Sequence, residues 1–352
     1  MPLAVTAAVE RYWPELDGLR AVAVTLVLLL HTRIPWARGG AVGVDIFFTL
    51  SGYLITSVLL AEHRRTDRIA LGRFYIRRLL RLYPALVVLV AFSTLTWISL
   101  EPEARLRAVR GALLTITYSI NWFELHATNH YFGVFGHTWS LAIEEQFYLA
   151  WPVMLLLLVR WRGERFGVFV SIAMICLSML YTGVTYHLLG WKRVYYGTDA
   201  RFPELLIGST AAMAYPSWKP GGHIATYLNA VAVISLGAIA AWVVYPPPIM
   251  FTGYIGFSFV ALASGAVILM LATRPWEIAR NTLGSWPLIA IGRISYGVYL
   301  WHWPIIFLLD LSKPQLDPYI RLAIAAPASV GIAYVSHRWI ESPFLQLKKR
   351  LV

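Results

Sequence analysis

Residues 17–31 read DGLRAVAVTLVLLLH, an apolar stretch that carries Arg20 near one end and His31 at the other. The ten residues between these two are apolar or small, apart from Thr25. An α-helix has about 3.6 residues per turn and rises about 1.5 Å per residue, so Arg20 and His31 share one face, about 16 Å apart. The stretch therefore predicts a membrane helix with a fixed cation and a titratable imidazole on the same side.

The whole chain has the composition of a protein that crosses a membrane many times. Of its 352 residues, 58% are hydrophobic and 14% are charged, whereas a typical soluble domain is about 25% charged. Apolar runs long enough for a bilayer core recur along the chain, and they are continuous rather than alternating. We predict an all-α polytopic transmembrane bundle, formed by a single membrane domain over residues 1–352.

Ten membrane spans are expected, with a short re-entrant or interfacial segment at 111–123. The expected spans are 18–33, 41–61, 82–100, 139–159, 166–189, 203–216, 224–245, 251–272, 294–310 and 319–340. The segment 62–81 holds seven arginines, and cytoplasmic loops are enriched in Lys and Arg. This bias predicts that both termini are cytoplasmic, and it explains the net charge of +12 without nucleic acid.

Ionisable residues inside spans are costly unless paired or solvated, so each is a candidate functional group. In the second span, Asp45 lies near the outer end, at the depth of His31. A carboxylate there could orient the imidazole and stabilise its protonated form. The alternatives are structural: Arg20 reaches towards the membrane surface, and Asp45 caps a helix or forms an ion pair.

An arginine cluster marks the start of the third span. In RFYIRRLLRLYPAL (73–86), Arg77, Arg78 and Arg81 are spaced to lie close together on a helix. Guanidinium groups bind phosphate bidentately, so a nucleotide-bearing cosubstrate is one explanation. Anionic lipid headgroups and the positive-inside bias are the other.

Two further stretches place polar groups on one helix face. In GHTWSLAIEEQFYLAWP (136–152), His137, Ser140 and Glu144 share a face, while Glu145 and Gln146 are expected to point elsewhere. His137 or Glu144 is a candidate for acid–base chemistry or for binding an acceptor. In ISYGVYLWHWP (294–304), Ser295, Tyr299 and His302 share a face, although tyrosines at span ends are often interfacial. Glu204 is an isolated candidate.

These stretches together resemble the acyltransferase-3 family of integral-membrane acyltransferases. The resemblance covers nearly the whole chain. It runs in order through LDGLRAVAVTLVLLLH, GVDIFFTLSGYLI, FYIRRLLRLYPAL, HTWSLAIEEQFYLAWP and RISYGVYLWHWP. The family's Arg-x10-His, Arg-x-x-Arg and Trp-Ser-Leu-x-x-Glu patterns fall on the following residues: Arg20 and His31; Arg78 and Arg81; Trp139, Ser140 and Glu144.

The resemblance implies transfer of an acyl group, usually acetyl, from cytoplasmic acyl-CoA to a hydroxyl group. Usual acceptors are sugars of surface polysaccharide, lipopolysaccharide or peptidoglycan, or lipid-linked precursors, and some members acylate macrolides or other secondary metabolites. Such a protein is expected in the bacterial cytoplasmic membrane. Many relatives carry a fused extracytoplasmic hydrolase-like domain, and we expect none here.

On this interpretation His31 is a general base or a transient acyl carrier, with Asp45 holding its ring and Glu144 nearby. Arg20, Arg77, Arg78 and Arg81 are expected to bind acyl-CoA. The expected acceptor-binding residues are His137, Trp139, Ser140, Tyr299 and His302. No HExxH or CxxC motif indicates a metal. A proton-coupled transporter or flippase, and a non-catalytic assembly partner, remain as rival hypotheses.

Overall fold

Helices form all of the regular secondary structure in the residues that the computed structural model describes, which are 12–126, 133–214, 223–273 and 277–351. The prediction of an all-α bundle is confirmed. Residues 215–216 of the sixth predicted span lie outside the described residues.

Each predicted span corresponds to a helix. These helices are α2 (Pro14–His31), α3 (Val42–Thr66), α4 (Leu71–Leu100), α7 (Trp139–Arg162), α8 (Glu164–Leu189), α10 (Thr198–Ala214), α11 (His223–Val244), α13 (Phe257–Thr273), α16 (Ser295–Ser312) and α17 (Pro318–Ser336). The number ten is approximate. Seven helices of the described residues are long and apolar enough to cross a membrane, or eight if one bent pair counts as a single span. The helix α2 has three charged residues within its 18, and α10 has only 17 residues.

Short helices lie between the long ones, and two more follow α17. They are η1 (Pro102–Ala104), α5 (Arg105–Ile116), α6 (Ile120–Glu124), η2 (Gly133–Thr138), α9 (Trp191–Tyr196), α12 (Ile249–Phe251), η4 (Thr252–Gly256), α14 (Glu277–Thr282), α15 (Trp286–Arg293), η5 (His337–Glu341) and α18 (Ser342–Leu351). The predicted re-entrant segment at 111–123 folds as parts of α5 and α6. A turn separates them, with Tyr118 in the left-handed region at φ 51°. Neither helix is long enough to cross a bilayer.

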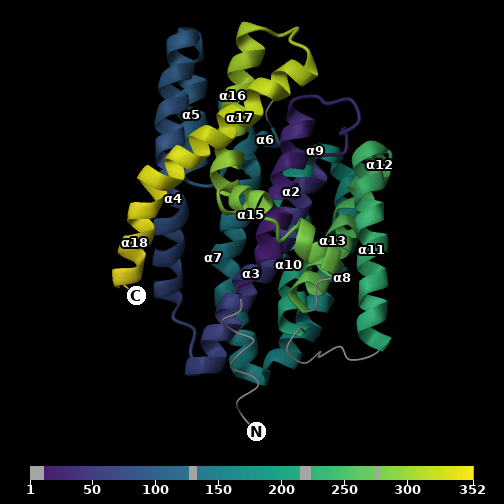
Figure 1. Ribbon diagram of the computed structural model, residues 1–352. Coiled ribbons are helices and arrows are strands. Elements are labelled where there is room, and N and C mark those ends of the chain that lie inside the picture. Colours follow the sequence, from purple (N-terminus) through teal and green to yellow (C-terminus); the bar gives the residue numbers. More distant parts are fainter. Residues whose placement is uncertain (1–11, 127–132, 215–222, 274–276, 352) are drawn as a thin grey trace.

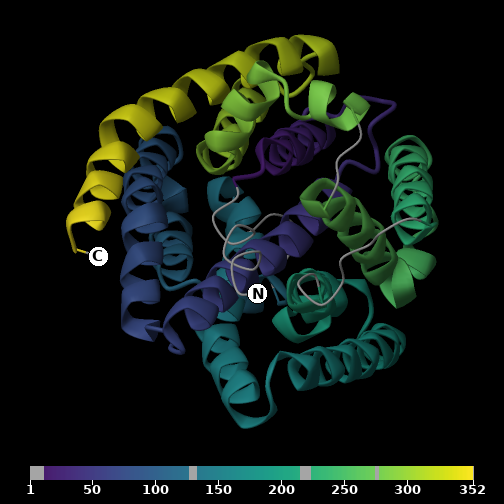
Figure 2. The same cartoon turned by 60° about the horizontal axis from the view of Figure 1, so that its bottom comes forward.

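The helix α3 lies in the middle of the bundle (Figures 1 and 2). It packs against α2, α7, α10 and α13. On one side of α3 stand α4 and α5, with α17 and α18 beyond them, and on the other stand α8 and α11 (Figure 2). The outer helices α8 and α11 bury little of their surface, as expected of helices that face lipid.

Close backbone contact joins α3 to α10. A Cβ atom added at Gly208 would lie 1.8 Å from the carbonyl oxygen of Thr49, and one at Gly52 would lie 1.9 Å from that of Leu205. Lipid tails are as apolar as a helix surface, so membrane helices associate through such close packing and through polar contacts. The face of α3 that carries Thr49 and Gly52 is therefore a packing seam against α10.

The last long hairpin contains a sharp bend. The helices α15 and α16 meet at 70°. The helix α16 then packs along α17, which begins at a capped end where the Asp317 carboxylate accepts hydrogen bonds from the backbone N–H groups of Tyr319 and Ile320. The bend brings the first turns of α16, with Ser295 and Tyr299, to a cavity in the bundle.

Candidate active site

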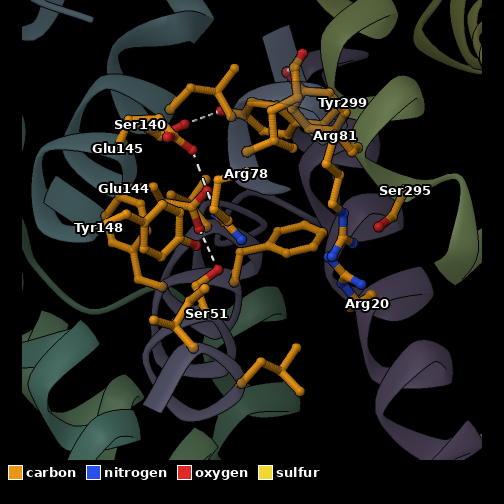
Figure 3. Close-up of a pocket in the computed structure, with 18 of the residues that line it drawn as sticks. Arg20, Ser51, Arg78, Arg81, Ser140, Glu144, Glu145, Tyr148, Ser295 and Tyr299 are labelled. Carbon is orange, nitrogen blue, oxygen red and sulfur yellow. Dashed lines mark hydrogen bonds and ion pairs between the residues drawn. The ribbon is translucent and has the colours of Figure 1, made fainter. Parts of the chain in front are cut away.

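A cavity of about 140 Å³ lies between α2, α3, α4, α7 and the start of α16 (Figure 3). Its polar lining consists of Arg20, Ser51, Arg78, Arg81, Tyr118, Ser140, Glu144, Glu145, Tyr148, Ser295, Tyr296 and Tyr299. Six residues predicted as site residues therefore meet in one place. They are Arg20, Arg78, Arg81, Glu144, Ser140 and Tyr299.

The three arginines of the cavity differ in how their charge is balanced. Arg78 contacts Glu145 at 3.5 Å and stacks 3.7 Å from the ring centre of Tyr148. Arg20 lies 3.7 Å from Asp17. Arg81 makes no hydrogen bond or ion pair with any residue that the structure describes, and its guanidinium points towards Arg20 (Figure 3). The cavity therefore holds one guanidinium, that of Arg81, without a hydrogen bond or ion pair among the described residues, and this group suits an anionic ligand.

Arg77 does not belong to this cationic group. It lies 3.6 Å from Glu62 and is absent from the cavity lining. Neighbouring helix residues point about 100° apart, so Arg77 projects from α4 in a different direction from Arg78. The predicted grouping of Arg77 with Arg78 and Arg81 around one ligand is not the arrangement found.

Both adjacent glutamates of α7 face the cavity. Glu144 accepts a hydrogen bond from Ser51 at 2.6 Å, and Glu145 contacts Arg78. The prediction that Glu145 points elsewhere is wrong, because the cavity is wider than a single helix face. Ser51 and Tyr148 were missed. Tyr148 was detectable because it lies one helical turn after Glu144, whereas nothing in the sequence separated Ser51 from other span hydroxyls.

His31 lies beside His302 rather than beside Asp45. The Nδ1 atom of His31 is 2.8 Å from Nε2 of His302, and the two rings are stacked 5.1 Å apart. The edge of Trp303 packs against His31 at 4.7 Å between ring centres. The predicted contact between Asp45 and His31 is wrong, because the Asp45 carboxylate binds Arg201 at 2.6 Å.

Arg201 forms a buried cluster with two carboxylates. Its guanidinium reaches Asp45 on α3 and, at 3.1 Å, Glu204 on its own helix. All three side chains are almost fully buried, and Arg201 also lies 3.8 Å from the ring centre of Phe257. Glu204 is therefore not isolated. Sequence reasoning missed Arg201, although its position three residues before Glu204 was a signal for an ion pair.

Tyr299 connects the cavity with the histidines. Its hydroxyl is 2.5 Å from Ser140 Oγ and donates to the His137 carbonyl oxygen at 3.0 Å. Its backbone carbonyl is 2.6 Å from Nδ1 of His302. The predicted polar face joining Arg20 to His31 is thus interrupted: Arg20 lines the cavity, and His31 is reached through Tyr299 and His302.

Two other predicted acceptor-binding residues lie around this region. His137 packs against His302 with ring centres 5.6 Å apart, and its Nε2 lies 3.1 Å from the Leu300 carbonyl oxygen. Trp139 packs between Phe48 and Tyr195 and does not line the cavity. Among the described residues, no group of three His, Cys, Asp or Glu side chains is placed to hold a metal.

The fold and the site define a polytopic helical membrane protein with a cavity lined by charged groups inside the bundle. The model of the family described as "Acyltransferase domain", the third acyltransferase family, matches residues 13–338. The chain belongs to this family, so the resemblance noted in the sequence is confirmed. No solved structure matches the chain.

Curated relatives match along almost the whole chain. The peptidoglycan O-acetyltransferase OatA of Listeria monocytogenes is 35% identical over 355 residues, covering 95% of this chain and 56% of the relative. A putative peptidoglycan O-acetyltransferase of Bacillus subtilis, YrhL, is 34% identical, with 95% and 55% covered. The O-acetyltransferase OatA of Staphylococcus aureus is 33% identical, with 95% and 57% covered. The chain thus spans little more than half the length of these relatives.

Proposed function

We propose that the protein is a membrane O-acetyltransferase that moves an acetyl group from acetyl-CoA to a hydroxyl of a cell-wall sugar. The names of the relatives support this acceptor class, because they include peptidoglycan O-acetyltransferases. The protein would lie in the bacterial cytoplasmic membrane with both termini cytoplasmic, as the arginine-rich connection between α3 and α4 favours. Acylation of a macrolide or another glycosylated metabolite would use the same chemistry.

The observation that carries the proposal is that three arginines, Arg20, Arg78 and Arg81, line one cavity, and that Arg81 has no hydrogen bond or ion pair among the described residues. The guanidinium of Arg81 lies next to that of Arg20, so a bound anion beside Arg81 lowers the energy of the site. A proton-coupled transporter could use Glu144 and Glu145 of the same cavity, but proton transfer alone gives no role to three arginines that stay charged. The phosphates of acetyl-CoA match this charge, with the acyl-bearing arm extending past Tyr299 towards His31.

The transfer itself needs a base near the thioester. A ring nitrogen of His31 would take the proton from the acceptor hydroxyl as its oxygen attacks the thioester carbonyl. The carbon–sulfur bond then breaks, and the departing CoA sulfur takes that proton from His31. If His31 instead carried the acetyl group transiently, the acceptor would attack acetyl-His31 in a second step.

The test uses purified protein in lipid nanodiscs with acetyl-CoA, scored for free CoA with and without soluble peptidoglycan fragments. We expect acceptor-dependent release of CoA and acetylated sugars by mass spectrometry. His31→Ala should lower the rate by about 10²–10⁴-fold, the range expected for loss of a general base. A wild-type protein that releases no CoA with any acceptor would refute the proposal and favour a transporter or an assembly partner.

Glu144 is proposed to assist binding or proton transfer, because its carboxylate lies in the cavity and is oriented by Ser51. His137, Trp139 and Ser140 are proposed to support the acceptor side, together with Tyr299. Asp45 has no part in orienting His31, since its carboxylate binds Arg201.

A further inference from the structure

His302 occupies the middle of a hydrogen-bond chain in which each donor can be identified. Its Nδ1 lies 2.6 Å from the backbone carbonyl oxygen of Tyr299, three residues earlier in α16. A carbonyl oxygen can only accept a hydrogen bond. The proton therefore lies on Nδ1 of His302, and the network rather than an observed hydrogen makes this assignment.

The second ring nitrogen of His302, Nε2, must then be a hydrogen-bond acceptor. A neutral imidazole has one N–H group, so with Nδ1 protonated its Nε2 carries a lone pair. The ring is fully buried, and its contacts are with His31 and a backbone carbonyl rather than with a carboxylate. A buried cation without a counter-charge is costly, so the neutral ring is favoured. His31 Nδ1, 2.8 Å away, is consequently the donor to His302.

We infer that His302 is a positioning residue that holds His31 in the tautomer with its proton on Nδ1. The Nε2 atom of His31 is then the basic and nucleophilic nitrogen. No described residue hydrogen-bonds to this nitrogen, and the His31 side chain is only partly buried, so Nε2 is free to meet a substrate. His302 thereby fills, without a negative charge, the role that a carboxylate has beside many catalytic imidazoles.

The tautomer can be measured directly, without any enzymatic assay. Protein labelled with ¹⁵N in its histidine rings would be studied by NMR in nanodiscs, with His31 signals assigned by their loss in His31→Gln. We expect His31 with a protonated Nδ1 and an unprotonated Nε2. A wild-type His31 that carries its proton on Nε2 would overturn the inference, whatever the variants do.

Two substitutions at residue 302 separate positioning from packing. His302→Leu removes the acceptor and should let His31 populate both tautomers. His302→Gln offers a side-chain oxygen in its place and should retain the proton on Nδ1 of His31. His187→Leu is the matched control, because it removes a histidine of α8 whose ring contacts Tyr254 and not this cluster. A His31 tautomer unchanged in His302→Leu would contradict the inference.

The kinetic test rests on the proposed function. His302→Leu should lower kcat by about 10²-fold, since a wrong tautomer removes general-base catalysis, while KM for acetyl-CoA stays unchanged. His302→Gln should recover most of kcat. If the wild-type protein transfers no acetyl group, the proposed function fails and the tautomer result still stands. If His302→Leu has wild-type kcat in an active protein, the positioning role fails instead.

Discussion

At the scale of single residues, Arg81 offers the sharpest test of the cavity. Its guanidinium has no partner among the described residues and lies in the cavity beside Arg20. A hydrogen bond to a charged group contributes about 1.5–3 kcal/mol, which corresponds to roughly a 10- to 150-fold change in affinity. We expect Arg81→Ala to raise KM for acetyl-CoA within this range. The KM of Arg81→Lys should lie between those of the wild type and Arg81→Ala, because lysine keeps the charge but cannot bind phosphate bidentately.

Arg77→Ala is the matched control for Arg81→Ala. It removes the same charge from the same helix, but Arg77 contacts Glu62 and does not line the cavity. Steady-state kinetics with acetyl-CoA should show an unchanged KM for this variant. An equal rise in KM for acetyl-CoA in Arg77→Ala and Arg81→Ala would mean that the arginines act through general surface charge.

Glu124 gives a prediction about pH. This residue of the short helix α6 is 7% exposed, and burial raises the pKa of its carboxyl to about 7, against an opposing influence of Lys192. The folded protein therefore keeps a proton that the unfolded chain releases above its ordinary pKa of about 4.5. Stability from this group is full below that pKa and falls as the pH rises towards 7.

The measurement for Glu124 is thermal unfolding in nanodiscs at about pH 5 and about pH 8, on either side of the titration. We expect the wild-type Tm to fall between these values by more than the Tm of Glu124→Gln, which has no such proton to lose. A larger pH dependence in Glu124→Gln than in the wild type would contradict the assignment.

At the scale of elements, the seam between α3 and α10 depends on two glycines. Gly208→Ala would place a methyl group 1.8 Å from the Thr49 carbonyl oxygen, so the backbones must separate. Overpacking of this kind costs about 1–3 kcal/mol, and separation also weakens the contact between Asp45 and Arg201. We expect a lower Tm. Gly237→Ala in α11 is the control, since nothing lies within 4 Å of its added methyl group, and its Tm should not fall.

Helical period explains which parts of the site could be predicted. Arg78 and Arg81, and likewise Tyr299 and His302, are one turn apart in their own helices, so their shared faces follow from spacing alone. The ion-pair partner of Asp45 could not be predicted from spacing within a helix. Arg201 lies 156 residues further along the chain. The hydrophobic periodicity of a helix indicates its buried face but does not identify the helix that packs against that face.

The same limit explains the error about His31. The sequence placed Asp45 and His31 at the same depth in the membrane, but equal depth does not say in which direction each side chain points. The rotation of α3 about its own axis decides which neighbours its side chains meet. Its face with Val44, Phe47 and Ser51 lines the cavity, while its face with Asp45 and Thr49 packs against α10. The fold class and the spans were predictable because a continuous apolar run of about 20 residues has the length needed to cross a bilayer.

At the scale of the whole molecule, the two ends of the bundle should face opposite sides of the membrane. The connection between α3 and α4 lies at the bottom of Figure 1, and that between α16 and α17 lies at the top. Cysteines replacing Asp67 and Gln315, one in each connection, would be introduced into a Cys176→Ser background. A membrane-impermeant maleimide should label Gln315→Cys in intact cells and Asp67→Cys only after permeabilisation. The reverse pattern would invert the proposed topology.

The contact between Asp45 and Arg201 also has a consequence for the synthesis of the protein and its insertion into the membrane. Ribosomes add about 5–20 residues per second, so roughly 8–30 s pass between synthesis of the two partners, 156 residues apart. During this interval α3 carries an unpaired carboxyl group in its first turn, and an ionisable side chain within a membrane span is unfavourable unless it is paired or solvated. The Asp45 carboxylate of the central helix α3 therefore has no Arg201 to pair with until α10 has been synthesised.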